Sequence, residues 1–271
     1  MTAISATLPS NYPYQAGLNA QRAIYPTPFA DAYARSALYI PQLESAAELE
    51  QLTREGWRAR RSFDASRHPE WAARIITQLV DANRGRALIL AAKAADGRMY
   101  ADYPRRNLPG ITVHSQWDGG TPSRIVSEWR DDIGDVLVGT KSMMTGVDAP
   151  GETNSLVIID RVPRSPSNPI DDARAEEIEA RTGDKWGADR AVYSVDAALL
   201  LAQAAGRLIR HTGDTGLVAC LDPRLLRAPG GKPGPITYPE PSRQVYMEAL
   251  YPFGQKLSQL SGALEWLRER R

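Results

Sequence analysis

The chain has 271 residues, of which 42% are hydrophobic and 24% are charged. These values are ordinary for a globular protein and exclude disorder over most of the length, which suits one large domain or two small ones. The formal net charge of +1 excludes a general electrostatic attraction to nucleic acid, so any such binding depends on a local basic patch. Charge alone favours a solvated face over a binding patch for the two basic clusters. These clusters are Arg58, Arg60, Arg61 and Arg67, and Arg98, Arg105 and Arg106.

Cysteine and histidine argue against a metal site built from this chain. Cys220 is the sole cysteine of the sequence and lies in an apolar run, as a buried small hydrophobic residue would. One cysteine excludes a disulfide framework and a four-cysteine zinc site. His68, His114 and His211 are too far apart in sequence to have metal-ligand spacing. With no run of 18 apolar residues and no signal peptide, the expected location is cytoplasmic and away from membranes.

Short apolar runs alternate with helical stretches along most of the chain. The runs are bounded by Gly, Asp or Pro, and their near-continuous hydrophobicity predicts parallel strands buried on both faces. They cover residues 86–92, 111–114, 135–139, 155–160 and 216–222.

Helical periodicity fills the intervals between these runs. Apolar side chains recur along one face in residues 69–83, 123–130, 194–209 and 254–271. The alternation predicts an α/β fold with a parallel sheet and helices on both faces. Residues 1–60 contain five scattered prolines and are expected to be an irregular lead-in, which leaves 61–271 as the domain.

The stretch from Gly139 to Gly151 is dense in groups that bind phosphate. It follows an apolar run, so in a parallel sheet it would start at the carboxyl edge, where ligands bind. Thr140 and Ser142 offer hydroxyls, Gly146 permits close backbone approach, and Asp148 suits a ribose hydroxyl. Taken alone, however, the stretch favours a plain strand-to-helix loop with a capping hydroxyl.

A phosphate-binding loop is missing from the sequence. That loop requires Gly, four residues, and then Gly-Lys-Ser/Thr. Gly134 and Gly139 have the right separation, but Thr140 intrudes before Lys141, which makes the loop one residue too long to wrap a phosphate. No Asp-Glu pair ends an apolar run to hold magnesium either. The chain therefore cannot assemble a complete nucleotide-hydrolysing site by itself.

A second candidate stretch is 203–210. If it is helical, Gln203, Arg207 and Arg210 are spaced four and three apart and line one face, with Gly206 removing bulk beside them. Guanidinium groups placed in this way suit phosphate oxygens. Arginines near a helix C-terminus also offset the helix dipole, and the stretch alone favours neither reading.

In this order, the two stretches resemble motifs V and VI of DinG-like superfamily-two ATP-dependent DNA helicases. The resemblance implies that the chain is the C-terminal RecA-like lobe of such an enzyme, a fold of the P-loop NTPase type. Residues 155–163 resemble the strand after motif V, residues 216–224 the closing strand, and residues 86–92 and 113–116 the earlier strands. The segments 27–29 and 37–41 resemble the lead-in to this lobe, and Ile4 to Leu8 resembles motif III, so the likeness spans nearly the whole chain.

The resemblance also implies roles for individual residues. Arg207 and Arg210 would be arginine fingers on the γ-phosphate of ATP, with Gln203 and Gly206 beside them. Gly146 and Asp148 would flank the nucleotide. The remaining candidates would contact single-stranded DNA: Thr140, Ser142, Gln116 and Lys93.

The sequence departs from this family in three places. Thr145 stands where a glutamate is common, and residues 91–94 (Ala-Ala-Lys-Ala) replace the aromatic and hydroxyl residues usual after the motif IV strand, which leaves one nucleic-acid contact in doubt. The first lobe, with its phosphate-binding loop and Mg²⁺ ligands, is missing. A second polypeptide is therefore expected to supply that lobe, and the chain alone should be inactive. The alternative is a non-catalytic module, derived from a helicase lobe, that binds nucleic acid or a protein partner.

Overall fold

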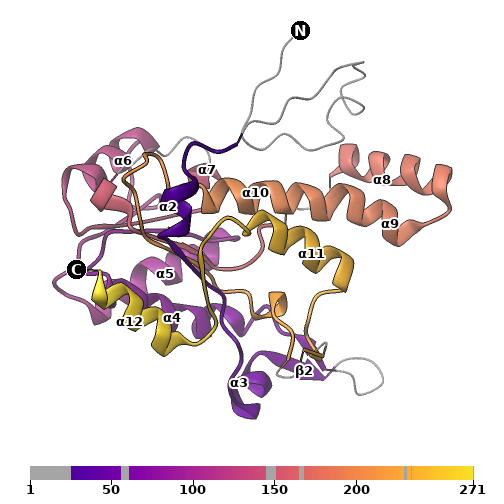
Figure 1. Cartoon of the computed structure of the whole chain (residues 1–271), viewed down its shortest axis with the longest axis horizontal. Helices are drawn as coiled ribbons and strands as arrows, with labels where there is room; N and C mark the ends of the chain where they lie inside the picture. Colours follow the sequence, from indigo (N-terminus) through magenta and orange to yellow (C-terminus); the bar gives the residue numbers. More distant parts are fainter. Residues whose placement is uncertain are drawn as a thin grey trace, which may run out of the picture.

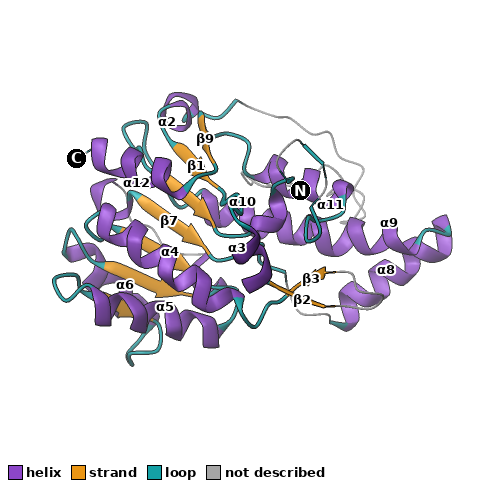
Figure 2. Cartoon of the chain, turned by 90° about the horizontal axis from the view of Figure 1, so that it is seen from below, coloured by secondary structure: helices purple, strands orange, loops and turns teal. Residues whose placement is uncertain are grey.

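The computed structural model describes residues 26–55, 61–144, 151–164, 168–228, 231–232 and 234–270. Within these residues, seven strands form one sheet in the order β5-β6-β4-β7-β8-β1-β9, and all paired neighbours are parallel (Figure 2). The strands are β1 Ala37–Tyr39, β4 Ala87–Leu90, β5 Val113–Ser115, β6 Val136–Gly139, β7 Leu156–Ile159, β8 Leu217–Cys220 and β9 Gln255–Leu257. The predicted fold, a parallel RecA-like sheet with helices on both faces, is confirmed.

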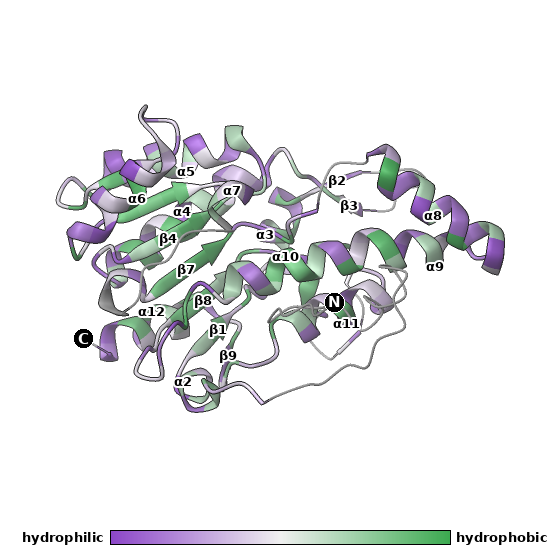
Figure 3. Cartoon of the chain, turned by 90° about the horizontal axis from the view of Figure 1, so that it is seen from above, coloured by the Kyte–Doolittle hydropathy of each residue, from purple (hydrophilic) through white to green (hydrophobic). Residues whose placement is uncertain are grey.

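Four of the five apolar runs contain the strands β4, β6, β7 and β8, and the run 111–114 overlaps β5, which extends one residue further to Ser115. Every residue of β4, β6, β7 and β8 is buried. Each large aliphatic side chain removed from water contributes roughly 1.5–3 kcal/mol, so these runs supply much of the drive to fold. Figure 3 shows β4, β7 and β8 in the green of hydrophobic residues.

Helices cover both faces of the sheet. Leu88 and Leu90 belong to the core beneath α6, α10 and α11, whereas Ala87 and Ile89 belong to the core beneath α4, α5 and α12. The helices are α2 Ala30–Ala34, α3 Ala46–Gln51, α4 His68–Ala82, α5 Ala94–Asn107, α6 Pro122–Asp131, α7 Lys141–Met144, α8 Pro169–Thr182, α9 Lys185–Asp189, α10 Val195–Ala205, α11 Glu240–Ala249 and α12 Leu260–Glu269. A two-stranded antiparallel sheet pairs β2 Thr53–Glu55 with β3 Arg61–Phe63.

Two of the four predicted helices match closely, and two differ. Helices α4 and α6 lie within one residue of their predicted bounds. Helix α10 ends at Ala205, four residues before the predicted end, because the chain turns at Gly206. Where a helix was predicted over residues 254–271, the chain first forms the edge strand β9, and helix α12 starts only at Leu260.

The segment before residue 61 differs from the expected irregular lead-in. Strand β1 lies between β8 and β9 in the sheet, and all three of its residues are buried. A strand of three residues among prolines gives too short an apolar run to stand out in the sequence. The motif III resemblance at residues 4–8 lies outside the described residues.

Helices α8 and α9 form an arm that extends away from the sheet (Figures 1 and 3). A π-helical turn, Arg190–Ser194, joins α9 to α10. Trp186, at the start of α9, is 80% exposed. None of the described helices is both long enough and apolar enough to cross a membrane.

Candidate functional site

Three of the predicted nucleic-acid residues meet at the carboxyl edge of the sheet. Gln116 follows β5, and Thr140 follows β6. The side-chain oxygen Oε1 of Gln116 accepts hydrogen bonds from the Thr140 backbone N–H (2.8 Å) and from the hydroxyls of Thr140 (3.2 Å) and Ser142 (3.3 Å). Ser142 is exposed, and the other two residues are partly exposed. The structure therefore brings together a compact set of polar groups that can face an oxygen-rich ligand.

Lys93 lies at the same edge, in the short loop that joins β4 to α5. Its side chain is exposed, and the residue is the N-cap of α5, so its charge stands beside the positive end of the helix dipole. Asp160 fixes this loop, because its Oδ1 accepts a hydrogen bond from the backbone N–H of Ala92 (2.9 Å).

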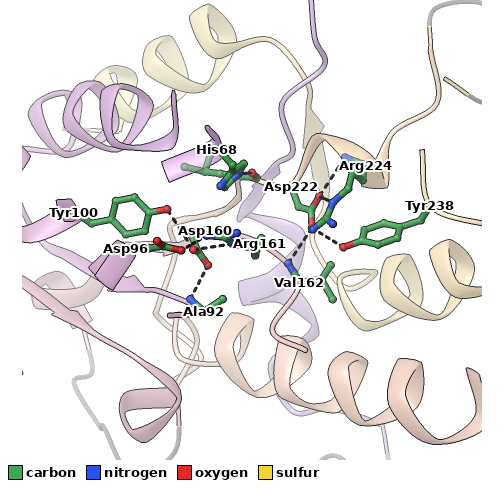
Figure 4. Close-up of polar contacts among 11 residues, drawn as sticks. His68, Ala92, Asp96, Tyr100, Asp160, Arg161, Val162, Asp222, Arg224 and Tyr238 are labelled. Atoms are coloured by element: carbon green, nitrogen blue, oxygen red, sulfur yellow. Dashed lines mark hydrogen bonds and ion pairs between the residues drawn. The ribbon is translucent and has the colours of Figure 1, made fainter. Parts of the chain in front are cut away.

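A buried network of charges lies below this edge, between β4 and β7 (Figure 4). Asp160 Oδ2 accepts hydrogen bonds from Arg161 Nε (3.2 Å) and the Tyr100 hydroxyl (3.3 Å), and Arg161 also pairs with Asp96 of α5. Burial raises the pKa of Asp160 to about 6 against the opposing effect of Arg161. The crossover after β4 leaves on the α5 face and the one after β7 leads to α10 on the other face, so this is the switch point of the sheet. The buried side chains of Tyr100, Asp160 and Arg161 occupy this switch point.

A second buried network follows β8. The two carboxylate oxygens of Asp222 accept a bidentate pair of hydrogen bonds from Arg224 (2.7 and 2.8 Å). The Val162 N–H (3.1 Å) and the Tyr238 hydroxyl (3.0 Å) also donate to Asp222. Burial alone would raise the pKa of Asp222, but the charge and hydrogen bonds of Arg224 outweigh burial and lower it. The Arg224 guanidinium stacks on the rings of Phe63 (4.1 Å) and Tyr238 (4.4 Å).

His68 lies between the two networks and is neutral at ordinary pH. Its Nε2 is 2.7 Å from the carbonyl oxygen of Leu221, which can only accept, so Nε2 must carry the proton. Its Nδ1 is buried and has no hydrogen-bond partner among the described residues. Burial, and next the charge of Arg161, lowers the pKa of His68 to about 4. Protonation would therefore add an unsolvated charge near two arginines.

We expect His68 to make the fold sensitive to acid. Because the folded-state pKa of about 4 is below the ordinary 6.5, the unfolded state binds more protons in that window, and stability falls as pH falls from 6.5 to 4. The shift corresponds to a loss of at most about 3 kcal/mol. His68→Gln should flatten this part of the pH dependence of the thermal midpoint.

The matched control for this prediction is His211→Gln, because the His211 side chain is 67% exposed. Asp160 has a raised pKa, so it contributes the opposite slope, but it does so equally in all three proteins. An unchanged pH dependence in His68→Gln would contradict the assignment to His68.

The predicted arginine-finger stretch is not a continuous helix. Gln203 lies in the last turn of α10, whereas Arg207 and Arg210 lie beyond its end. The backbone N–H groups of Arg207 and Leu208 bond to carbonyls three residues earlier, which tightens the chain into turns. Asp214 then accepts the backbone N–H groups of Arg210 (2.6 Å) and His211 (2.7 Å). The prediction that the two arginines share a helix face with Gln203 is wrong, because Gly206 ends the helix.

The candidate residues occupy opposite edges of the sheet. The carbonyl of Arg207 accepts a hydrogen bond from Asn154 Nδ2 (2.9 Å), and Asn154 lies just before β7. Arg207 is thus at the amino edge, whereas Thr140 is at the carboxyl edge, about 13 Å away along a four-residue strand. The segment from Thr140 to Asn154 joins the two edges. Gly146 and Asp148 fall within it but lie outside the described residues.

Sequence reasoning missed both buried networks. A signal was present, because an aspartate follows each of two buried strands within two residues, with an arginine one or two residues later (Asp160 and Arg161, Asp222 and Arg224). An ionised side chain at the end of an apolar run needs a partner, and so it indicates a network there. The described residues contain no group of three or more His, Cys, Asp or Glu side chains that could hold a metal ion.

Comparison with known sequences gives one family and several relatives. The family described as "Helicase C-terminal domain" matches residues 76–233, more than half of the chain. The ATP-dependent helicase DinG of Mycobacterium tuberculosis is 39% identical over 158 residues, which are 58% of this chain and 23% of that protein. The ATP-dependent DNA helicase YoaA of Escherichia coli K12 is 35% identical over 162 residues, 59% of this chain and 24% of that protein. The chain thus spans about a quarter of the length of these relatives.

Comparison with solved structures gives the same fold. An XPD helicase structure aligns with 82% of this chain and 35% of its own, with a TM-score of 0.51 and 12% identity. The structure of S. cerevisiae Dbp5 bound to RNA and ADP BeF3 aligns with 98% of this chain and 53% of its own, also with a TM-score of 0.51, at 13% identity. At such low identities these likenesses concern the RecA-like fold alone.

Proposed function

Because the chain belongs to the helicase C-terminal domain family, as the C-terminal lobe of a DinG-like superfamily-two helicase, we propose that it is half of an ATP-dependent DNA helicase motor. In this proposal it supplies arginine fingers to an ATP site and a backbone-binding surface to single-stranded DNA. The observation that carries the proposal is the extent of the family match, since residues 76–233 include both candidate stretches.

The single-strand surface is the carboxyl-edge cluster of Gln116, Thr140, Ser142 and Lys93. The Gln116 amide NH2 and the Lys93 ammonium can donate to phosphate oxygens without reading bases, and the two hydroxyls would do so once they turn away from the Gln116 oxygen. The Gln116 oxygen already accepts from Thr140 and Ser142, which holds these polar groups in one place. Such contacts favour DNA of any sequence.

The nucleotide side is the amino-edge group around Arg207 and Arg210, with Gln203 at the end of α10. The two guanidinium groups would stabilise the charge that develops on the γ-phosphate. The family resemblance implies that Gly146 and Asp148, which lie outside the described residues, would flank the nucleotide. The Mg²⁺ that accompanies ATP would be held by the first lobe, which also carries the phosphate-binding loop.

The arrangement expected from the sequence, with the first lobe on a second polypeptide, is tested by mixing. The purified chain should hydrolyse no ATP, and addition of a DinG-like first lobe with a phosphate-binding loop should produce DNA-stimulated hydrolysis. Robust hydrolysis by the chain alone would refute the half-motor proposal. The alternative, a non-catalytic binding module, requires that the mixture stays inactive while the chain still binds DNA or a protein partner.

Lys93→Ala should weaken the salt dependence of single-strand binding. Loss of one phosphate contact lowers the slope of log K against log salt by about 0.7. Fluorescence anisotropy with labelled oligo(dT), titrated at several salt concentrations, measures this slope. Lys185→Ala is the matched control, because Lys185 is an exposed lysine on the arm. An identical slope in both variants would remove Lys93 from the proposed surface.

A further inference from the structure

Trp117 follows directly after Gln116 and rests on the first turn of α5. A Cβ atom added at Gly97 would come within 2.2 Å of the indole Cη2 and 3.2 Å of the Ala91 Cβ, so the ring fills the space that the missing side chain leaves. The backbone N–H of Trp117 donates to Ser115 Oγ (3.1 Å), which fixes the backbone at this position. Small residues at 91 and 97 thus seat a large ring between the ends of β4 and β5.

The ring remains partly exposed and has cationic neighbours. Arg98 places its guanidinium 5.6 Å from the ring centroid, and the side chains of Arg98 and Lys93 are both exposed. The acidic groups near the ring are already paired. Asp118 accepts from Arg105 and from the Ser115 N–H, and Asp96 pairs with Arg161. The surface around Trp117 therefore combines net positive charge with an aromatic ring.

We propose that Trp117, with Arg98 beside it, is a stacking platform for a base of single-stranded DNA. The inference rests on the proposed backbone surface, because Gln116 and Trp117 are consecutive residues. Gln116 would face the phosphates, and Trp117 would face a base. Proteins that bind single strands without sequence preference combine a basic track with aromatic rings, since every base has a π-face. Arg98 adds a cation to the same stack.

Two oligonucleotides separate stacking from backbone binding. One is labelled oligo(dT), and the other is an abasic oligonucleotide of the same length, which keeps its phosphates but has no bases. Anisotropy with the full chain should show tighter binding of oligo(dT). Trp117→Leu should weaken oligo(dT) binding roughly fivefold or more and leave abasic binding unchanged. The affinity of Trp117→Phe for oligo(dT) should lie between those of wild type and Trp117→Leu. Trp186→Leu, which removes the exposed tryptophan of the arm, should match wild type with both probes.

Photocrosslinking of the unmodified chain to 5-bromodeoxyuridine oligonucleotides gives a readout that does not depend on the folding of a variant. We expect the cross-link at Trp117, and a cross-link confined to other residues would overturn the proposal. If wild type binds both probes and Trp117→Leu changes neither affinity, the stacking role fails and the backbone surface survives. If wild type binds neither probe, the backbone surface fails as well.

Discussion

Arg207→Ala is expected to lower DNA-stimulated ATP hydrolysis by the two-lobe assembly by roughly 10³-fold or more. An arginine finger acts on charge that appears only in the transition state, so its loss should lower turnover far more than it weakens ATP binding. The measurement is steady-state hydrolysis by the chain mixed with a first lobe that carries the phosphate-binding loop.

The expectation of a large effect rests on how firmly the backbone is held at the fingers. Asn154 is 2% exposed and donates to the carbonyl of Arg207, while Asp214 is 8% exposed and accepts two backbone N–H groups at Arg210 and His211. Both arginine side chains are partly exposed. The anchoring groups are therefore buried and hold the backbone in place, and such preorganisation gives a finger its effect.

Two variants make the result specific. Arg207→Lys keeps the charge but loses the planar fork, so it should also be severely impaired. Arg268→Ala removes an exposed arginine from α12, on the opposite face of the sheet from α10, and should hydrolyse ATP like wild type. Arg207→Ala should still bind single-stranded DNA, because Thr140 and Ser142 lie at the other edge. Full hydrolysis by Arg207→Ala would rule out Arg207 as a finger.

The sequence predicted those elements whose pattern lies within their own residues, and it missed those that depend on neighbouring elements. Strands β4 and β6 to β8 are continuous aliphatic runs, and their pattern alone indicates a buried parallel strand. Helix α5 gives no such pattern, because Gly97 and Pro104 lie inside it and Tyr100 is the one large side chain on its buried face. Strand β9 is a three-residue edge with two exposed positions, and neighbouring strands define it more than its own sequence does.

The site divides in the same way. Gln116, Thr140 and Ser142 could be grouped from the sequence because each follows a predicted strand, and parallel strands bring their carboxyl ends together. The long-range partners in this network could not be predicted, because Tyr100, which donates to Asp160, and Asp96, which pairs with Arg161, are more than 50 residues away and only tertiary packing selects them. The predicted end of α10 was wrong for a third reason. Helical spacing continues through Arg210 in the sequence, but the chain leaves the helix at Gly206, and Asp214 then accepts the backbone N–H of Arg210.

Asp222→Ala is expected to destabilise the fold by about 3–5 kcal/mol, which for a chain of this size lowers the thermal midpoint by roughly 6–20 °C. Removal of one partner of a buried ion pair leaves the other charge without compensation. Arg224 would keep its contacts with the Phe63 and Tyr238 rings but lose both oxygens of its bidentate pair. The Val162 N–H and the Tyr238 hydroxyl would lose their acceptor as well.

The control for this effect is an exposed ion pair with the same N–O distance. Arg124 Nε and Glu128 Oε1 are 2.7 Å apart, the same distance as Arg224 Nε and Asp222 Oδ1. The side chains of the first pair are 73% and 45% exposed, against 18% and 0% for the second. Glu128→Ala should therefore leave the thermal midpoint almost unchanged, because solvent screens the exposed charges. Asp222→Ala combined with Arg224→Met should recover part of the lost stability, since no charge is then left buried alone. Equal effects of Asp222→Ala and Glu128→Ala would mean that burial does not set the strength of this pair.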